Sequence, residues 1–164
     1  MDKKEVIFLM DSRIEIKDIL NKVYRYCSKA EKCEYDIKKY IDFFDIAESD
    51  KQKIIDKLYF EDFLNKERYI KAFVNDKIKF NKWGKTKILN ELLLKQFDKH
   101  LIIFYLNNIN KDDYLLMIKN VLKTKSKQIK KKDDFSYRNS LIRFGLSRGF
   151  DYENIEKAMN ELNS

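Results

Sequence analysis

DKHLIIFYL, residues 98–106, is the stretch that decides the fold, because its pattern recurs on both sides of it. The earlier copy is DKQKIIDKL at 50–58, and the later copy is DYENIEKAM at 151–159. Each copy starts with Asp and places an apolar residue four and eight positions later, which is the spacing of one helix face. Asp50, Asp98 and Asp151 are predicted N-caps, because a carboxylate accepts from free first-turn amides. The sequence therefore predicts three copies of one helical unit.

Helical spacing extends outward from these copies over most of the chain. From about Lys17 onward, apolar residues recur at steps of three and four. The later helices are expected at about 66–80, 85–95, 99–107, 111–132, 134–147 and 152–162. The chain has no proline and only three glycines, which favours helices over sheets with tight turns.

We therefore predict an all-α fold of three tandem three-helix repeats, arranged as an elongated, curved array. The predicted repeats are 17–60, 61–108 and 109–164, after an N-terminal tail at 1–16. The protein is expected to be monomeric.

The composition favours a polyanionic partner over a catalytic role. Charged residues make up 38% of the chain, and its net charge is +8, which favours nucleic acid; a solvated lysine-rich surface is the alternative. His100 is the only histidine and is expected at the surface, so no metal site is predicted. Cys27 and Cys33 are expected to be reduced, because six residues along a helix point the two side chains to different faces. No second cysteine pair could complete a zinc site.

Neither a cofactor site nor a membrane segment is predicted. The glycines do not form a phosphate-binding loop, so we expect no cofactor and no enzymatic activity. The apolar run at 6–10 is too short for a signal peptide or a membrane span. A cytoplasmic location is expected.

The longest basic stretch runs from Lys119 to Lys132 and holds seven lysines and no acid. On a helix, one face of it would be cationic, opposite a face with Ile118 and Leu122. The predicted cationic face consists of Lys119, Lys123, Lys127, Lys130 and Lys131. Lysine ammonium groups suit phosphate-backbone contacts without base readout. A face that only aids solubility is the alternative.

Two smaller basic clusters are further contact candidates. In the first, Trp83 stands among lysines, where it could stack on a base or anchor a protein interface; the alternative is a core Trp. The lysine candidates around it are Lys77, Lys82, Lys85 and Lys87. The second cluster is Arg138, Arg143 and Arg148, in a chain where arginine is scarce and bidentate contacts would explain its use.

Three groups of motifs stand out between residues 17 and 162. The central group comprises a Glu67-Arg68-Tyr69 helix, a basic linker to Gly84, and a basic helix that reaches Leu92. The third repeat has Arg143-Phe144 and then Arg148-Gly149-Phe150, and the first repeat has Tyr26-Cys27-Ser28 and Cys33. Together these motifs resemble the RecX family, including its Arg-Gly-Phe corner and the cysteines of one subgroup.

The resemblance implies structural roles at the helix corners. Gly84, Gly149 and Phe150 are the predicted structural corner, in which Gly149 is left-handed and Phe150 packs back on the helix. Gln96 stands at the equivalent place in the second repeat, so that corner is either strained or a different turn. Asn65 stands where the family usually has Asp and is still expected to cap a helix.

The resemblance also implies a function. A RecX protein binds the RecA filament on single- or double-stranded DNA, contacts the phosphate backbone, and restrains ATP hydrolysis, strand exchange and the co-protease activity of the SOS response. A stand-alone DNA-binding helical module is one alternative. A helical-repeat adaptor that binds protein alone is the other.

Overall fold

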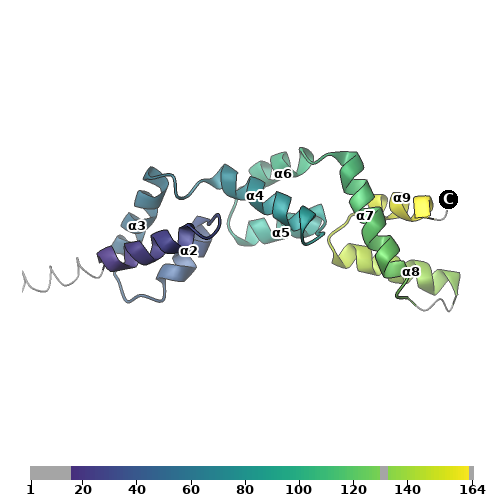
Figure 1. Cartoon of the computed structure of the whole chain (residues 1–164), viewed down its shortest axis with the longest axis horizontal. Coiled ribbons are helices and arrows are strands. Elements are labelled where there is room, and N and C mark those ends of the chain that lie inside the picture. The colour runs from purple at the N-terminus through teal and green to yellow at the C-terminus, as the bar shows by residue number, and fades with distance from the viewer. Residues whose placement is uncertain (1–15, 130–132, 163–164) are drawn as a thin grey trace, which may run out of the picture. The chain divides into compact units, whose positions relative to one another are not determined.

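The structure is a computed structural model that describes residues 16–129 and 133–162. Within those ranges every regular element is an α-helix, which confirms the predicted all-α class (Figure 1). The first helix covers residues 16–27. It is followed by α2 (Glu34–Ile41), α3 (Glu48–Phe60), α4 (Lys66–Lys79), α5 (Lys85–Leu94), α6 (Lys99–Asn107), α7 (Lys111–Ser126), α8 (Asp134–Ser147) and α9 (Tyr152–Leu162).

The helices follow one another in triplets, as expected of tandem three-helix repeats. The limits proposed for the repeats stay predictions. Of the tail proposed at 1–16, positions 1–15 lie outside the described residues, and position 16 begins the first helix. The chain divides into two compact units, one that ends at Tyr69 and one that begins at Ile70. Each unit has its own apolar core, so each is described by itself.

The first unit is built around the helix at 16–27, α2 and α3. Each of these helices turns a stripe of branched aliphatic residues inward, as their three- and four-residue spacing requires. The buried core consists of Ile19, Val23, Ile37, Ile41, Ile54, Ile55, Leu58 and Leu64. Burial of one such side chain stabilises the fold by about 1.5–3 kcal/mol.

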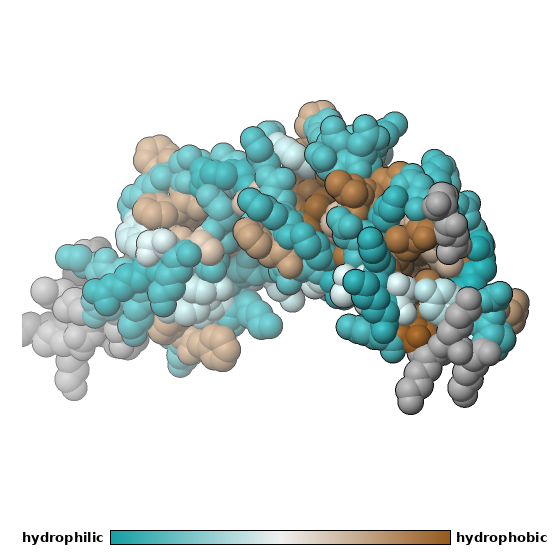
Figure 2. Space-filling model, turned by 45° about the vertical axis from the view of Figure 1, so that its right-hand side comes forward, coloured by the Kyte–Doolittle hydropathy of each residue, from teal (hydrophilic) through white to brown (hydrophobic). Residues whose placement is uncertain are grey.

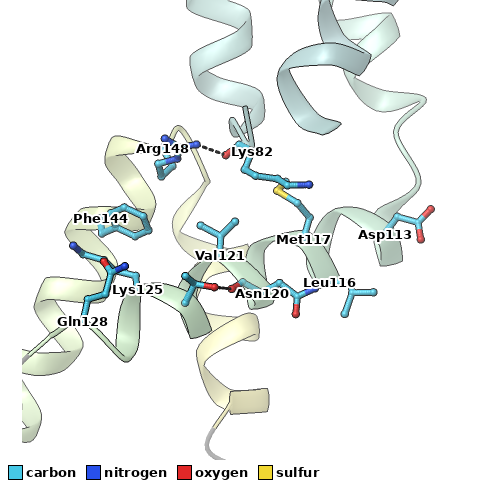
Figure 3. Close-up of a pocket in the computed structure, with 11 residues that line it drawn as sticks. Lys82, Asp113, Leu116, Met117, Asn120, Val121, Lys125, Gln128, Phe144 and Arg148 are labelled. Atoms are coloured by element: carbon cyan, nitrogen blue, oxygen red, sulfur yellow. Dashed lines mark hydrogen bonds between the residues drawn. The ribbon is translucent and has the colours of Figure 1, made fainter. Parts of the chain in front are cut away.

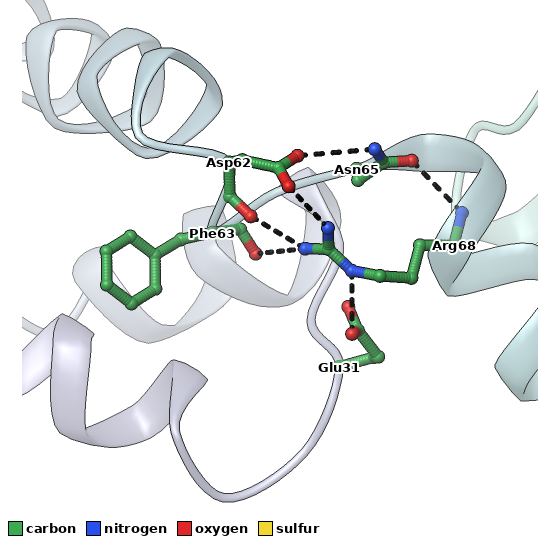
Figure 4. A network of polar contacts seen from close by, with 5 residues as sticks. All are labelled: Glu31, Asp62, Phe63, Asn65 and Arg68. Carbon is green, nitrogen blue, oxygen red and sulfur yellow. Dashed lines mark hydrogen bonds and ion pairs between the residues drawn. The ribbon is translucent and has the colours of Figure 1, made fainter.

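A single arginine ties together the polar edge of this unit (Figure 4). The Arg68 Nε donates to Glu31 at 2.7 Å, and its Nη1 donates to Asp62 at 2.8 Å. Its Nη2 donates to the Asp62 carbonyl at 2.7 Å. Asn65 caps α4 by accepting from the Arg68 amide at 3.0 Å, as expected. Its side chain and Arg68 together lower the pKa of Asp62.

The second unit holds most of α4 and the helices from α5 to α9. In α5 and α6 the buried residues are Ile88, Leu92, Ile102 and Leu106. Helices α7, α8 and α9 surround a further core. Its buried members are Tyr114, Ile118, Leu122, Leu141, Phe150, Ile155, Ala158 and Met159.

Two of the three predicted N-caps are confirmed. Asp98 caps α6 by accepting from the Leu101 amide, and Asp151 precedes α9 and accepts from the Asn154 amide at 2.9 Å. The prediction for Asp50 is wrong. Helix α3 already begins at Glu48, because the Asp50 amide itself donates to the Ala47 carbonyl. Asp50 therefore lies within the first turn, where its negative charge still complements the helix dipole.

The predicted helix at 111–132 is too long. Helix α7 ends at Ser126, and Lys127 is its C-cap residue. The Ser126 hydroxyl donates to the Lys123 carbonyl at 2.7 Å, and that competition with the backbone ladder favours a helix end. Lys130 and Lys131 lie outside the described residues.

The same backbone corner closes α3, α5 and α8. Its central residue is left-handed, and the amide of the following Phe donates back to a carbonyl in the last helical turn. The left-handed residues are Asp62 (φ 57°), Gln96 (φ 65°) and Gly149 (φ 85°). Gly149 and Phe150 therefore adopt the predicted corner, and Gln96 adopts the strained alternative.

Gln96→Gly is expected to raise the free energy of unfolding by about 1 kcal/mol, because glycine has no Cβ to penalise the left-handed backbone. Urea denaturation measures this change. Gln96→Ala keeps the penalty and is expected to bring no gain. Equal stability of the two variants would show that Gln96 is not strained.

Gly84 and Gly149 join the second and third helix triplets through backbone atoms. The Gly84 amide donates to the Arg148 carbonyl at 2.7 Å, and the Thr86 amide donates to the Gly149 carbonyl at 3.1 Å. A Cβ on Gly84 would lie 2.0 Å from the Gly149 carbonyl carbon. We call this contact the glycine joint. It holds α5 against the corner that follows α8.

Candidate functional site

Three of the predicted contact residues surround one cavity in the third triplet. Its volume is about 580 Å³. Its lining residues belong to helices α7, α8 and α9, except Lys127, which directly follows α7. We call it the cationic cavity. It is lined by Lys123, Ser126, Lys127, Asp134, Tyr137, Arg138, Leu141, Met159 and Leu162. The structure thus brings Lys123 and Lys127, one helical turn apart, next to Arg138 from another helix.

The positive charges of this cavity differ in how far the protein's own acids neutralise them. Arg138 pairs with Glu156, and Lys119 on the same helix as Lys123 pairs with Glu161 at 3.2 Å. Lys123 and Lys127 are exposed, and neither forms an ion pair with an acid among the described residues, although Asp134 lines the same cavity. Because they stand near the C-terminal end of α7, they also complement its dipole. Their ammonium groups remain accessible to an anion from outside.

Trp83 lies between two of its predicted lysine neighbours. The Lys77 Nζ lies 4.8 Å and the Lys87 Nζ 4.6 Å from the centre of its ring. Trp83 is half-buried. It is therefore neither a fully exposed stacking platform nor a fully buried core residue, the two alternatives that the sequence left open. Both distances are within the range of cation–π attraction. Whether this group also contacts a partner stays a prediction.

Two other predicted contacts take part in the glycine joint. Arg148 donates through Nη2 to the carbonyl of Asn81 and, at 3.2 Å, to that of Lys82. The Lys85 amide donates to the Tyr114 hydroxyl at 2.9 Å. Partial burial lowers the pKa of the Lys85 ammonium against the opposing effect of nearby Asp151. Burial also raises the pKa of Tyr114 to about 12. These groups hold the joint, and their contact with a partner stays a prediction.

The remaining candidates are separate from the cationic cavity. Arg143 and Lys82 are exposed. Lys82 lines a different hollow with Arg148, between α7 and α8 (Figure 3). The structure therefore divides the eleven described candidates among several surfaces and does not form one continuous ridge from them.

The sequence analysis missed the hollow between α7 and α8. Its apolar lining is Leu116, Met117, Val121 and Phe144. The signal was present in residues 114–118, where five apolar residues follow one another. An amphipathic helix with one buried stripe does not need such a run. Hydrophobic residues do reach the surface among hydrophilic ones in the half of Figure 2 that holds the C-terminal helices.

Other kinds of site find no support in the described residues. His100 is exposed, and no group of three or more His, Cys, Asp or Glu side chains there could hold a metal ion. Cys27 and Cys33 are not joined in a disulfide, and Cys33 is buried. None of the described helices is long and apolar enough to cross a membrane.

Comparison with known proteins gives one consistent family. Residues 65–102 match the family model for RecX, second three-helix domain. The chain is 32% identical to Regulatory protein RecX of Finegoldia magna over 61% of its length and 50% of the relative's. It is 32% identical to Regulatory protein RecX of Clostridium botulinum, strain Eklund 17B, over 66% of its length and 51% of the relative's.

Solved structures share the fold. A crystal structure of a regulatory protein RecX superposes with a TM-score of 0.83 at 17% identity, over 98% of this chain and 80% of the other. RecX from Lactobacillus salivarius gives 0.79 at 19% identity, over 92% of this chain and 98% of the other. The chain spans about half the length of the first curated relatives it matches.

Proposed function

Because the chain belongs to the RecX family of regulatory proteins, we propose that it binds the RecA filament on DNA and inhibits it. The affected activities are ATP hydrolysis, strand exchange and co-protease activity. The protein acts without catalysis of its own, as a monomer in the cytoplasm, where such filaments form. It binds both single- and double-stranded DNA within the filament through the phosphate backbone.

The cationic cavity is the observation that supports contact with DNA. Lys123 and Lys127 are exposed, are unpaired among the described residues, and lie one turn apart beside Arg138. An ammonium group on a flexible stem binds phosphate without reading the base. Such contacts suit a regulator that must act on a filament of any DNA sequence.

The proposal predicts that substoichiometric protein lowers the single-stranded-DNA-dependent ATPase rate of RecA and co-sediments with the filaments. The double variant Lys123→Ala/Lys127→Ala is expected to need on the order of tenfold more protein for the same inhibition, because two phosphate contacts are lost. Steady-state ATPase titration measures the shift.

The matched control is Lys38→Ala/Lys53→Ala. It removes the same net charge from lysines that already pair with Glu34 and Asp50. This control is expected to inhibit RecA as the unaltered protein does. Absence of both inhibition and co-sedimentation by the unaltered protein would refute the proposal.

The same variants separate the two alternative functions. A stand-alone DNA-binding module would bind bare DNA equally well with or without RecA, with an affinity that falls steeply with salt. An adaptor that binds protein alone would keep its partner affinity after loss of Lys123 and Lys127. The cationic cavity favours the DNA-binding module as the second candidate.

A further inference from the structure

The hollow between α7 and α8 is an apolar groove with basic residues around its edge (Figure 3). Its volume is about 560 Å³. Met117 and Val121 from α7 and Phe144 from α8 are half-buried in it, and Leu116 is 56% exposed. A single exposed leucine is ordinary, but a leucine continuous with three further apolar side chains around a hollow marks a binding surface.

The charges around this apolar groove are unevenly placed. Of the described lining residues, Lys82, Lys125 and Arg148 are basic, and Asp113 is the one acid. Asp113 and Lys125 are twelve residues apart on α7, which corresponds to about 18 Å along a helix. Figure 3 accordingly shows Asp113 remote from Phe144 and Lys125. Lys125 and Arg148 lie toward the Phe144 end of the apolar groove, and the Lys82 side chain extends over Met117, between that end and Asp113 (Figure 3).

We propose that the apolar groove binds a peptide segment of a protein partner that carries large apolar side chains next to acidic ones. The apolar side chains contact Met117, Val121 and Phe144, and the carboxylates pair with Lys82 and Lys125. Arg148 forms part of the wall of the apolar groove and is not assigned a carboxylate partner, because its Nη2 already donates to two carbonyls. This interaction goes beyond the proposed function, since it concerns a surface separate from the cationic cavity.

The lining favours a peptide over single-stranded nucleic acid. Stacking of successive bases needs several aromatic platforms, whereas Phe144 is the only ring that lines the apolar groove among the described residues. The Lys125 Nζ lies 5.3 Å from the centre of that ring. Leu116, Met117 and Val121 offer aliphatic and thioether surface, which suits Leu or Phe side chains, and Asp113 repels a continuous phosphate chain.

Fluorescence anisotropy with the full chain and a fluorescein-labelled peptide tests the proposal. The probe is a 16-residue peptide in which Glu alternates with Leu and Phe. One control peptide has Lys for every Glu, and another has Ser for every Leu and Phe. The probe is expected to bind at least about tenfold more tightly than either control, because both features of the apolar groove contribute.

Two charge reversals on the same helix form the matched pair of protein variants. Lys125→Glu changes the apolar groove, and Lys123→Glu makes the same change at the cationic cavity. Lys125→Glu is expected to weaken peptide binding about tenfold or more, and Lys123→Glu is expected to leave it nearly unchanged. Leu116→Ser, at an exposed position, is expected to weaken it as well.

Several outcomes would overturn the proposal. One is equal binding of the three peptides, and another is equal loss in the two lysine variants. A third is displacement of the probe by a single-stranded oligonucleotide whose own binding depends on Lys125, which would make the apolar groove a nucleic-acid site. Failure to inhibit RecA, with Lys125-dependent peptide binding intact, would refute the proposed function and leave this inference standing.

Discussion

Phe150→Ala is expected to lower the free energy of unfolding by about 3–5 kcal/mol, the usual cost of truncating a fully buried Phe. Phe150 is 1% exposed, and its ring meets that of Tyr114 edge-on with the ring centres 6.3 Å apart. It follows the left-handed residue of its corner, so it packs between α7, α8 and α9. Urea denaturation followed by circular dichroism measures the loss.

The control uses the equivalent Phe of another corner. Phe63 follows the left-handed Asp62 after α3, but it is 37% exposed. Its ring centre lies 4.8 Å from that of Tyr24, so Phe63→Ala is expected to cost less than half as much. An equal loss in the two variants would mean that burial in the third triplet is not what makes Phe150 important.

Gly84→Ala is expected to lower the free energy of unfolding by about 3 kcal/mol. The new Cβ would lie 2.0 Å from both the carbonyl carbon and the carbonyl oxygen of Gly149, and backbone cannot swing aside as a side chain can. Overpacking of this kind costs about 1–3 kcal/mol. Separation of the joint would also weaken its two backbone hydrogen bonds, each worth about 1 kcal/mol.

Hydrogen exchange of the Thr86 amide reports on the joint directly, because this amide donates to the Gly149 carbonyl. Its exchange is expected to become faster in Gly84→Ala. The control is Gly145→Ala, where the new Cβ would meet the flexible Ile155 side chain at 2.7 Å and alanine suits the helix better. A smaller effect in Gly84→Ala than in Gly145→Ala would disprove the account of the joint.

The positions of the helices were largely predictable from the sequence, because they follow from the spacing of apolar residues and from capping residues. The helix starts after Asp98 and Asp151 are where the repeated pattern predicts them. Asp50 has the same apolar spacing after it, yet α3 starts two residues earlier, at Glu48. Spacing cannot distinguish an Asp that caps a helix from one in its first turn, because both positions favour a carboxylate.

The surface was less predictable because ion pairing depends on contacts between distant residues. Lys119 and Lys123 are equivalent in the sequence pattern, but only Lys119 meets an acid, Glu161 from α9. Arg138 likewise meets Glu156. The apolar groove escaped prediction because Val121 and Phe144 come from different helices, and their closeness depends on how those helices pack.

The glycine joint has an evolutionary consequence. Every residue has a main-chain carbonyl and every residue except proline has an amide N–H, so a contact between them asks little of neighbouring side chains beyond the missing Cβ atoms. Surfaces around such a contact can diverge while the architecture persists. Solved structures that share only 17–19% of their residues with this chain still superpose on it, so this fold tolerates wide sequence divergence.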